Sequence, residues 1–182
     1  MAREGSDRNR RPLDAAAIER LAIDYVARYA TSRAKLRAYL GRKLTERGWA
    51  GDHPPAIESL IARLTEAGFV DDRAFAEART ASLGRRGYGA HRVGAALRAA
   101  GIDSEDSEAA LQGAAESPWA AGEAFARRRR IGPFAREAGD REQRHKSLAA
   151  MLRAGHPSHV ARAFAYADPG ISPVPDEDGE PN

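Results

Sequence analysis

At several places along the chain, a large apolar residue is followed by glycine four positions later, and this spacing most limits how the chain can fold. Four of these pairs end an expected helix: Leu44 with Gly48, Leu64 with Gly68, Leu97 with Gly101, and Met151 with Gly155. Glycine is typical just past the end of a helix, where the backbone takes a positive φ that strains other residues. The pattern therefore predicts helices that end at these glycines.

The spacing of the glycines also predicts a repeat. The glycines that end the second, fifth and eighth expected helices, Gly48, Gly101 and Gly155, are separated by 53 and 54 residues. This regular spacing indicates three tandem three-helix units, over residues 13–69, 70–117 and 118–167. Units this small bury little alone, so we expect an elongated array of about nine stacked helices. Val and Ile together number only twelve, too few for a sheet, and the fold class is predicted to be all-α.

Capping and helix-breaking residues predict where each helix begins. Nine helices are expected to follow, in order, Asp14, Thr31-Ser32, Pro54-Pro55, Asp71 or Asp72, the glycines within 84–89, Asp103-Ser104, Ser117-Pro118, Gly132-Pro133 and Pro157. Because Asp71 and Asp72 stand directly before a helix, we expect them to cap it rather than to bind a metal or serve acid–base chemistry. Phe69 and Phe75 are expected to pack in the core.

Both ends of the chain differ from the region between them. Residues 1–12 are polar and arginine-rich, and residues 168–182 combine acidic side chains with prolines. Neither segment has enough large apolar side chains to form a core, so both are expected to be disordered. The net charge is +3, and the acidic end makes residues 13–167 more basic than the whole chain. A basic body favours a polyanion or an acidic protein surface as partner.

Several classes of protein are excluded by residue content. The chain has no cysteine, which removes disulfides, thiolate catalysis and Cys-ligated metals. It has no long apolar segment free of charge, so we expect a cytoplasmic protein. His156 and His159 have ligand-like spacing but lack a further zinc ligand. Without a phosphate-binding glycine loop or a nucleophile beside a base, we expect no enzyme activity, cofactor or metal.

Several motifs of this sequence occur together, in the same order, in one known family. They are Tyr25 to Tyr29, Ser32, Leu36, Leu40, Lys43-Leu44 and Gly48; Gly68-Phe69-Val70-Asp71-Asp72-Arg73 with Phe75-Ala76; and Arg85-Arg86-Gly87-Tyr88-Gly89 with Arg92-Val93, Leu97 and Gly101-Ile102. Over roughly residues 14–165 the chain resembles the bacterial RecX family, regulatory proteins that modulate the RecA recombinase. It departs from the family in the last repeat, where Ala154-Gly155-His156 replaces an Arg-Gly-Phe-like turn.

The resemblance implies a function that composition and spacing alone do not. A RecX-like protein is expected to bind in the groove of the RecA filament on single-stranded DNA, contact more than one protomer and block filament extension. It thereby mostly inhibits the recombinase, ATPase and coprotease activities of RecA, and regulates DNA repair, recombination and the SOS response. We expect a monomer, with weak direct DNA binding as a further property. The alternative is a helix-turn-helix-like DNA-binding transcription regulator, and a hydrolase is a third hypothesis.

The glycine-rich loop within residues 84–89 is the first candidate for partner binding. Its glycines allow a close approach of the backbone, its arginines donate directed hydrogen bonds, and its tyrosine can stack on a base. The candidate residues in and after the loop are Arg85, Arg86, Tyr88, His91 and Arg92.

Further candidates lie on three expected helices. On the helix after Ser32 they are Arg33, Arg37 and Lys43, of which the first two share a face. A duplex-DNA reader could use such a face, but the Asn/Gln/Arg cluster typical of a recognition helix is missing. The last repeat contributes Arg127, Arg128, Arg130 and Lys146. Because consecutive arginines point around a helix, those at 127–130 also fit a solvated helix end that complements the helix dipole.

Overall fold

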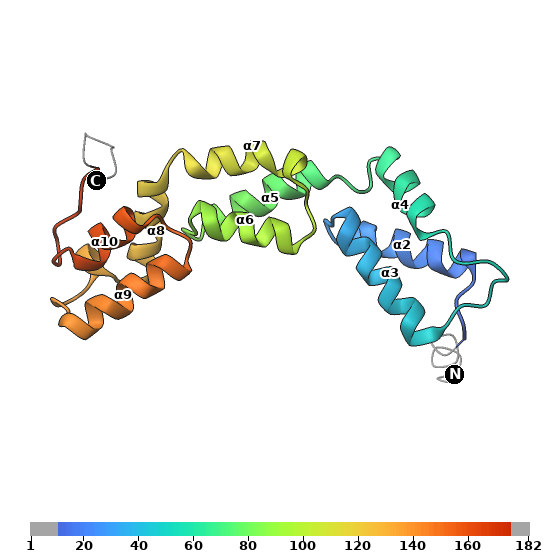
Figure 1. The fold of residues 1–182 in the computed structure, drawn as a ribbon, viewed down its shortest axis with the longest axis horizontal. Coiled ribbons are helices and arrows are strands. Elements are labelled where there is room, and N and C mark those ends of the chain that lie inside the picture. Colours follow the sequence, from blue (N-terminus) through green and yellow to red (C-terminus); the bar gives the residue numbers. More distant parts are fainter. Residues whose placement is uncertain (1–10, 176–182) are drawn as a thin grey trace. The chain divides into compact units, whose positions relative to one another are not determined.

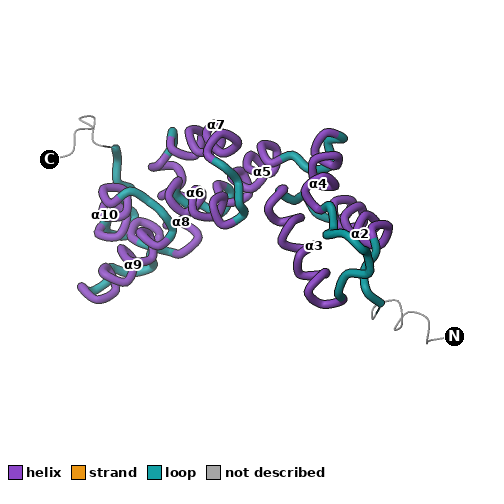
Figure 2. Tube along the Cα trace, turned by 45° about the vertical axis from the view of Figure 1, so that its right-hand side comes forward, coloured by secondary structure: helices purple, strands orange, loops and turns teal. Residues whose placement is uncertain are grey.

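The computed structural model describes residues 11–175, and this part of the chain is built from helices (Figure 1). It contains nine α-helices and one short 3-10 helix, joined by loops (Figure 2). The β pairing found within the described residues is an isolated bridge between Leu13 and Trp49, and no strand forms there. The all-α prediction is confirmed.

The chain divides into two compact units. The first comprises residues up to Phe75 together with Ala100–Ile102, and the second comprises Ala76–Ala99 and the residues from Asp103 onward. Helix α5 (Asp72–Gly84) begins in the first unit and continues in the second. The repeat boundaries and the elongated array stay predictions. Of the two expected disordered ends, residues 1–10 and 176–182 lie outside the described residues.

In the first unit, α2 (Ala15–Arg28), α3 (Arg33–Arg47) and α4 (Ile57–Glu66) pack around one apolar core. The Asp14 carboxylate caps α2, and the Ser32 hydroxyl caps α3; each accepts a hydrogen bond from a backbone N–H of the first turn. Side chains from all three helices are buried together: Ile18, Ala22, Leu36, Leu40, Leu60, Ile61 and Leu64.

The second unit holds the remaining helices. They are α6 (Ala90–Ala99), α7 (Ser104–Ala115), α8 (Pro118–Arg129), the 3-10 helix η1 (Gly132–Phe134), α9 (Arg141–Arg153) and α10 (Ser158–Tyr166). One buried cluster joins α8, α9 and α10 through Phe125, Met151, Val160 and Phe164. Pro118 occupies the first turn of α8, where a missing backbone N–H costs nothing.

The helix-ending glycines behave as the sequence predicts. Gly48, Gly68, Gly101 and Gly155 all have positive φ, between 70° and 89°. Two of them also lie in tight packing. A Cβ at Gly101 would collide with Ala34, and one at Gly155 would collide with the backbone of Arg92. Glycine is therefore required there for space as well as for backbone conformation.

Two expectations from the sequence are wrong. Phe69 is 63% exposed rather than buried, because the turn after α4 directs Val70, which is 1% exposed, into the core instead. The helix expected directly after Gly132-Pro133 begins later, at Arg141. Gly132 and Pro133 belong to η1 instead, and the side chain of Asp140 caps the helix proper by accepting a hydrogen bond from Gln143 N.

Candidate functional site

The loop between α5 and α6 is held firmly by its glycines. A Cβ at Gly87 would collide with the backbone of Phe125 in α8, and one at Gly89 with the backbone of Gly155. Gly89 N also donates a hydrogen bond of 3.0 Å to Ala154 O. The loop backbone therefore does approach another segment closely, as the sequence indicated, but that segment belongs to the second unit itself. This packing fixes the loop in place.

Cationic side chains project from this fixed loop. Tyr88 is half-buried, with its ring centroid 6.1 Å from that of Phe125. The Arg86 guanidinium lies 5.0 Å from the centroid of the Tyr88 ring, a cation–π contact. Arg85, Arg86, His91 and Arg92 are all exposed. Tyr88 thus serves mainly to hold the loop, and the arginines around it face solvent.

Five predicted cations are paired with carboxylates within the chain. The pairs are Arg33 with Asp72, Arg37 with Glu58, Lys43 with Glu46, Arg127 with Glu123, and Lys146 with Glu142. The hydrogen bond between Arg37 and Glu58 raises the pKa of Arg37 and lowers that of Glu58. Apart from Arg33 with Asp72, the pairs lie at the surface, with Lys43 partly buried at 27% side-chain exposure; surface pairs of this kind contribute little to stability and open readily to another anion.

The other predicted cations stand apart from these pairs. Within residues 11–175, Arg85, Arg86, Arg92, Arg128 and Arg130 form no ion pair, and all five are exposed. All belong to the second unit. Arg130 ends α8 with a φ of 54°, the one positive φ outside glycine in the described part of the chain. The loop and the end of α8 therefore present arginines whose hydrogen-bond donors are open to a partner.

Asp71 and Asp72 have different roles, although they are neighbours. Asp71 accepts a hydrogen bond from Ala74 N at 2.9 Å, which is the predicted capping of α5. Asp72 is 6% exposed and accepts hydrogen bonds from Arg33 N at 2.8 Å and from Arg33 Nε at 3.0 Å. Sequence reasoning missed this contact because its partners lie 39 residues apart.

A buried hydroxyl extends this polar contact within the first unit. Ser32 is fully buried and donates a hydrogen bond of 2.7 Å to Ala100 O, besides capping α3. The start of α3 is therefore tied to the start of α5 through Arg33 and to the turn after α6 through Ser32. Buried polar groups require hydrogen-bond partners of this kind.

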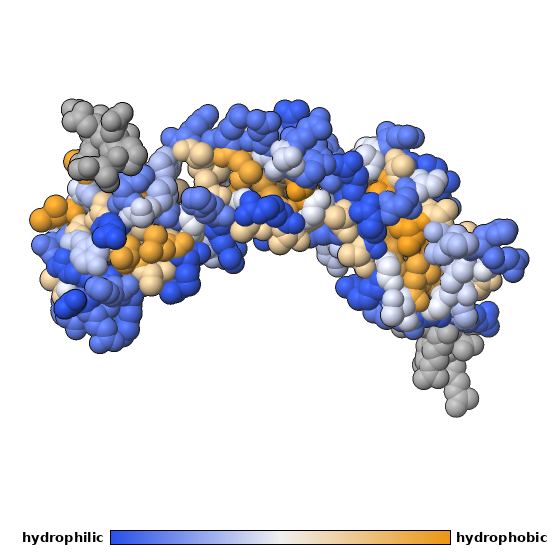
Figure 3. Space-filling view, viewed as in Figure 1, coloured by the Kyte–Doolittle hydropathy of each residue, from blue (hydrophilic) through white to orange (hydrophobic). Residues whose placement is uncertain are grey.

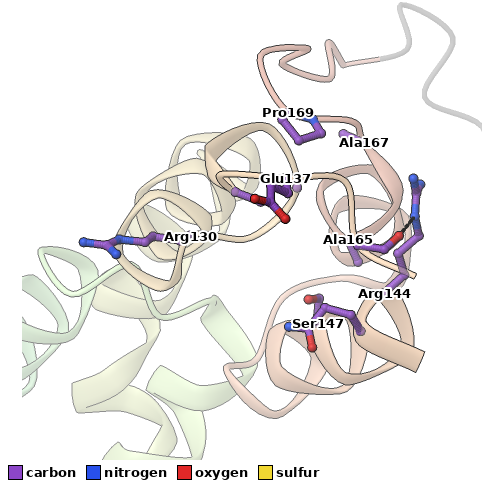
Figure 4. A pocket seen from close by; sticks show the side chains of 11 residues that line it. Arg130, Glu137, Arg144, Ser147, Ala165, Ala167 and Pro169 are labelled. Carbon is purple, nitrogen blue, oxygen red and sulfur yellow. Dashed lines mark hydrogen bonds between the residues drawn. The ribbon is translucent and has the colours of Figure 1, made fainter. Parts of the chain in front are cut away.

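A small pocket in the second unit is lined by Arg130, Glu137 and Arg144 among others (Figure 4). Its volume of about 50 Å³ has room for water but not for a substrate. Arg144 is occupied by structural contacts: it donates to Gly139 O and Tyr166 O, and to the Asp168 carboxylate at 2.7 Å. At this pocket, Arg144 of α9 therefore binds the end of α10 and the residues that follow it.

A groove of about 480 Å³ in the second unit lies among α5, α6, α7 and α8. Most of its lining side chains are alanines and glycines, and Figure 3 shows apolar residues gathered between α6 and α7. Of the two histidines with ligand-like spacing, His156 is buried against Phe125, whereas His159 is exposed and lies near Trp119. Neither arrangement brings together a set of acids and bases.

None of the helices in the described part of the chain is both long enough and apolar enough to cross a membrane. Within residues 11–175, no three His, Cys, Asp or Glu side chains are grouped to hold a metal ion.

Comparison with known proteins gives consistent matches. The family model described as the second three-helix domain of RecX matches residues 71–111. The regulatory protein RecX of Stenotrophomonas maltophilia is 34% identical over 162 residues, which cover 89% of this chain and 93% of that protein. The regulatory protein RecX of Myxococcus xanthus is 29% identical over 160 residues, covering 84% and 86% of the two chains.

A solved structure shows the same fold. The crystal structure of RecX from Lactobacillus salivarius matches with a TM-score of 0.58 over 82% of this chain and 93% of that chain, at 18% sequence identity. The helical arrangement is therefore shared although most residues differ.

Proposed function

Because this chain belongs to the RecX family of regulatory proteins, we propose that it binds the filament of the RecA recombinase on single-stranded DNA and restrains its activities. The observation that carries the proposal is the set of exposed arginines without ion pairs on the α5–α6 loop and at the end of α8. Arginine donates paired hydrogen bonds to carboxylates and phosphates, the two anionic groups of a protein–DNA filament.

The proposed mechanism is steric rather than catalytic. A filament repeats its subunits, so a helical protein with several cationic surfaces can contact more than one of them, and modest contacts then add up. Occupying the filament groove blocks the addition of the next protomer or the approach of a second DNA. The packing of Gly87 and Gly89 favours this binding, because a loop already held in place loses little entropy when it binds.

Charge reversal in the loop tests the proposal. The double variant Arg85→Glu with Arg86→Glu is expected to lose inhibition of ATP hydrolysis and strand exchange by RecA, because both donors become repelling carboxylates. The matched control is Arg153→Glu with Arg162→Glu, two exposed arginines of the same unit outside the candidate set.

The control carries the same change in net charge, so it is expected to keep most of the inhibition. Far-UV circular dichroism of both variants checks that the helices are intact. Equal loss in the two variants would show that only total charge matters and would remove the loop from the site.

A further inference from the structure

A second concave surface lies in the first unit, between α2 and α3, and no part of the proposed filament contact accounts for it. The groove has a volume of about 530 Å³. Its side walls include three tyrosines, Tyr25, Tyr29 and Tyr39, and three cations, Arg28, Arg42 and Lys43. We refer to these six residues as the tyrosine groove.

The tyrosines form a continuous aromatic surface. The rings of Tyr25 and Tyr39 are stacked, with centroids 4.2 Å apart and planes inclined by 18°. Tyr29 continues the series, with its centroid 5.3 Å from that of Tyr25. Tyr25 and Tyr39 are half-buried against the core, whereas Tyr29 is 59% exposed. Tyr29, the last ring of the series, is therefore packed against Tyr25 on one side and open to solvent on the other.

The cations surround these rings. The Arg42 guanidinium lies 5.6 Å from the centroid of the Tyr39 ring, and Lys43 Nζ lies 6.0 Å from the same centroid. Arg28 stands in the last turn of α2, next to Tyr29. Aromatic rings flanked by cations are the arrangement with which proteins bind single strands, because bases stack on the rings and phosphates contact the cations.

Two carboxylates restrain this surface. Glu46 binds Lys43 at 2.7 Å and also lies 3.5 Å from Arg42, and these contacts lower the pKa of Glu46. Asp24 lines the groove itself. Glu46 and Arg42 are exposed, and the Lys43 side chain is partly exposed at 27%, so a phosphate from solvent can replace the carboxylate at small cost.

From this arrangement we propose that the tyrosine groove binds single-stranded nucleic acid, with a nucleobase stacked on Tyr29 and the adjacent phosphates bound by the three cations. A duplex fits less well, since its bases are already stacked inside the helix. An acidic peptide would satisfy the cations but offers no planar group for the rings. The site does not rest on the proposed filament contact, which lies in the other unit.

The direct test is binding of a fluorescein-labelled oligothymidylate, measured by fluorescence anisotropy without recombinase. Tyr29→Ala is expected to weaken binding by about tenfold, the effect of losing one stacked base. Tyr29→Phe keeps the ring and is expected to bind like the original protein. The matched control is Tyr166→Ala, which removes a 40% exposed tyrosine of the second unit and is expected to change nothing.

An abasic strand of the same length separates stacking from charge. It presents the same phosphates, so it is expected to bind the original protein more weakly than oligothymidylate and to bind Tyr29→Ala no differently from the original protein. Equal affinity of the original protein for both strands would overturn the proposal. So would a poly-glutamate peptide that competes as strongly as the strand, since that result would indicate an acidic protein as the partner.

The cations are tested by salt dependence and by a variant that should gain affinity. Replacing Arg42 by Gln is expected to reduce the slope of log affinity against log salt by about 0.7, the value for one lost phosphate contact on a single strand. Glu46→Gln frees both Lys43 and Arg42 and is expected to tighten binding several-fold. Weaker or unchanged binding by Glu46→Gln would contradict the assignment. Because recombinase is absent, these results are independent of whether the filament contact is correct.

Discussion

Asp71 and Asp72 provide a matched pair of perturbations, because they are chemically identical neighbours with different surroundings. Asp71→Ala removes one exposed cap of α5, a bond of 2.9 Å to Ala74 N. Asp72→Ala removes a buried carboxylate that accepts two hydrogen bonds from Arg33. We expect the second substitution to destabilise the first unit considerably more than the first.

The structure sets the expected magnitudes. Losing a cap costs about 1 kcal/mol of unfolding free energy. In Asp72→Ala, the Arg33 side chain is 41% exposed and can turn to water, so its hydrogen bond contributes little to the loss. The remaining bond, from Arg33 N to a charged acceptor at 2.8 Å, is worth about 1.5–3 kcal/mol. We therefore expect Asp72→Ala to cost about 2–3 kcal/mol.

Tryptophan fluorescence can report on the first unit alone. The chain has two tryptophans, and Trp49 lies in the first unit whereas Trp119 lies in the second. In a Trp119→Phe background, urea unfolding followed through Trp49 measures the stability of the first unit. A loss for Asp72→Ala no larger than that for Asp71→Ala would refute the reasoning, because it would mean that the buried contact contributes nothing beyond a cap.

Two further predictions concern the helix ends. Gly48→Ala is expected to cost about 1–3 kcal/mol for its backbone conformation alone, because its φ of 79° and ψ of 173° are accessible essentially only to glycine and the added methyl meets open space. Gly101→Ala is expected to cost about 1–3 kcal/mol more, because its methyl collides with Ala34, and equal urea midpoints would contradict this. Burial lowers the pKa of His156 below its ordinary value of 6.5, so the unfolded chain binds a proton more readily than the folded chain does. The contribution of neutral His156 to the free energy of unfolding is therefore expected to be fully present above about pH 6.5 and to be lost as the pH falls from there toward the folded-state pKa. His156→Phe is expected to remove this part of the pH dependence of the urea midpoint.

Local features of the fold could be predicted because they depend on residues close together in sequence. The caps at Asp14 and Asp71 and the positive φ of the helix-ending glycines follow from the conformational preferences of single residues. The exposure of Phe69 could not be predicted in this way. After Gly68 either neighbour can turn inward, and the tertiary core selects Val70.

The candidate site was less predictable than the fold. The sequence indicates where arginines are, but not which of them meet a carboxylate, and Arg37 with Glu58 is a pair between different helices. It also does not show that Tyr25 and Tyr39, from separate helices, stack into one surface. A weak signal was present, since Tyr25 and Tyr29 are spaced four residues apart and Tyr39 precedes two cations on the next helix. Their meeting depends on how α2 and α3 pack.

Cosedimentation with recombinase filaments tests the central claim most directly. RecA assembled with ATP on single-stranded DNA is pelleted in the presence of this protein, and the pellet is compared with one from RecA-free DNA. We expect the protein to pellet with the filament in proportion to RecA, and the Arg85→Glu with Arg86→Glu variant to pellet far less. Recovery of the protein in the supernatant, whether or not filaments are present, would contradict the central claim.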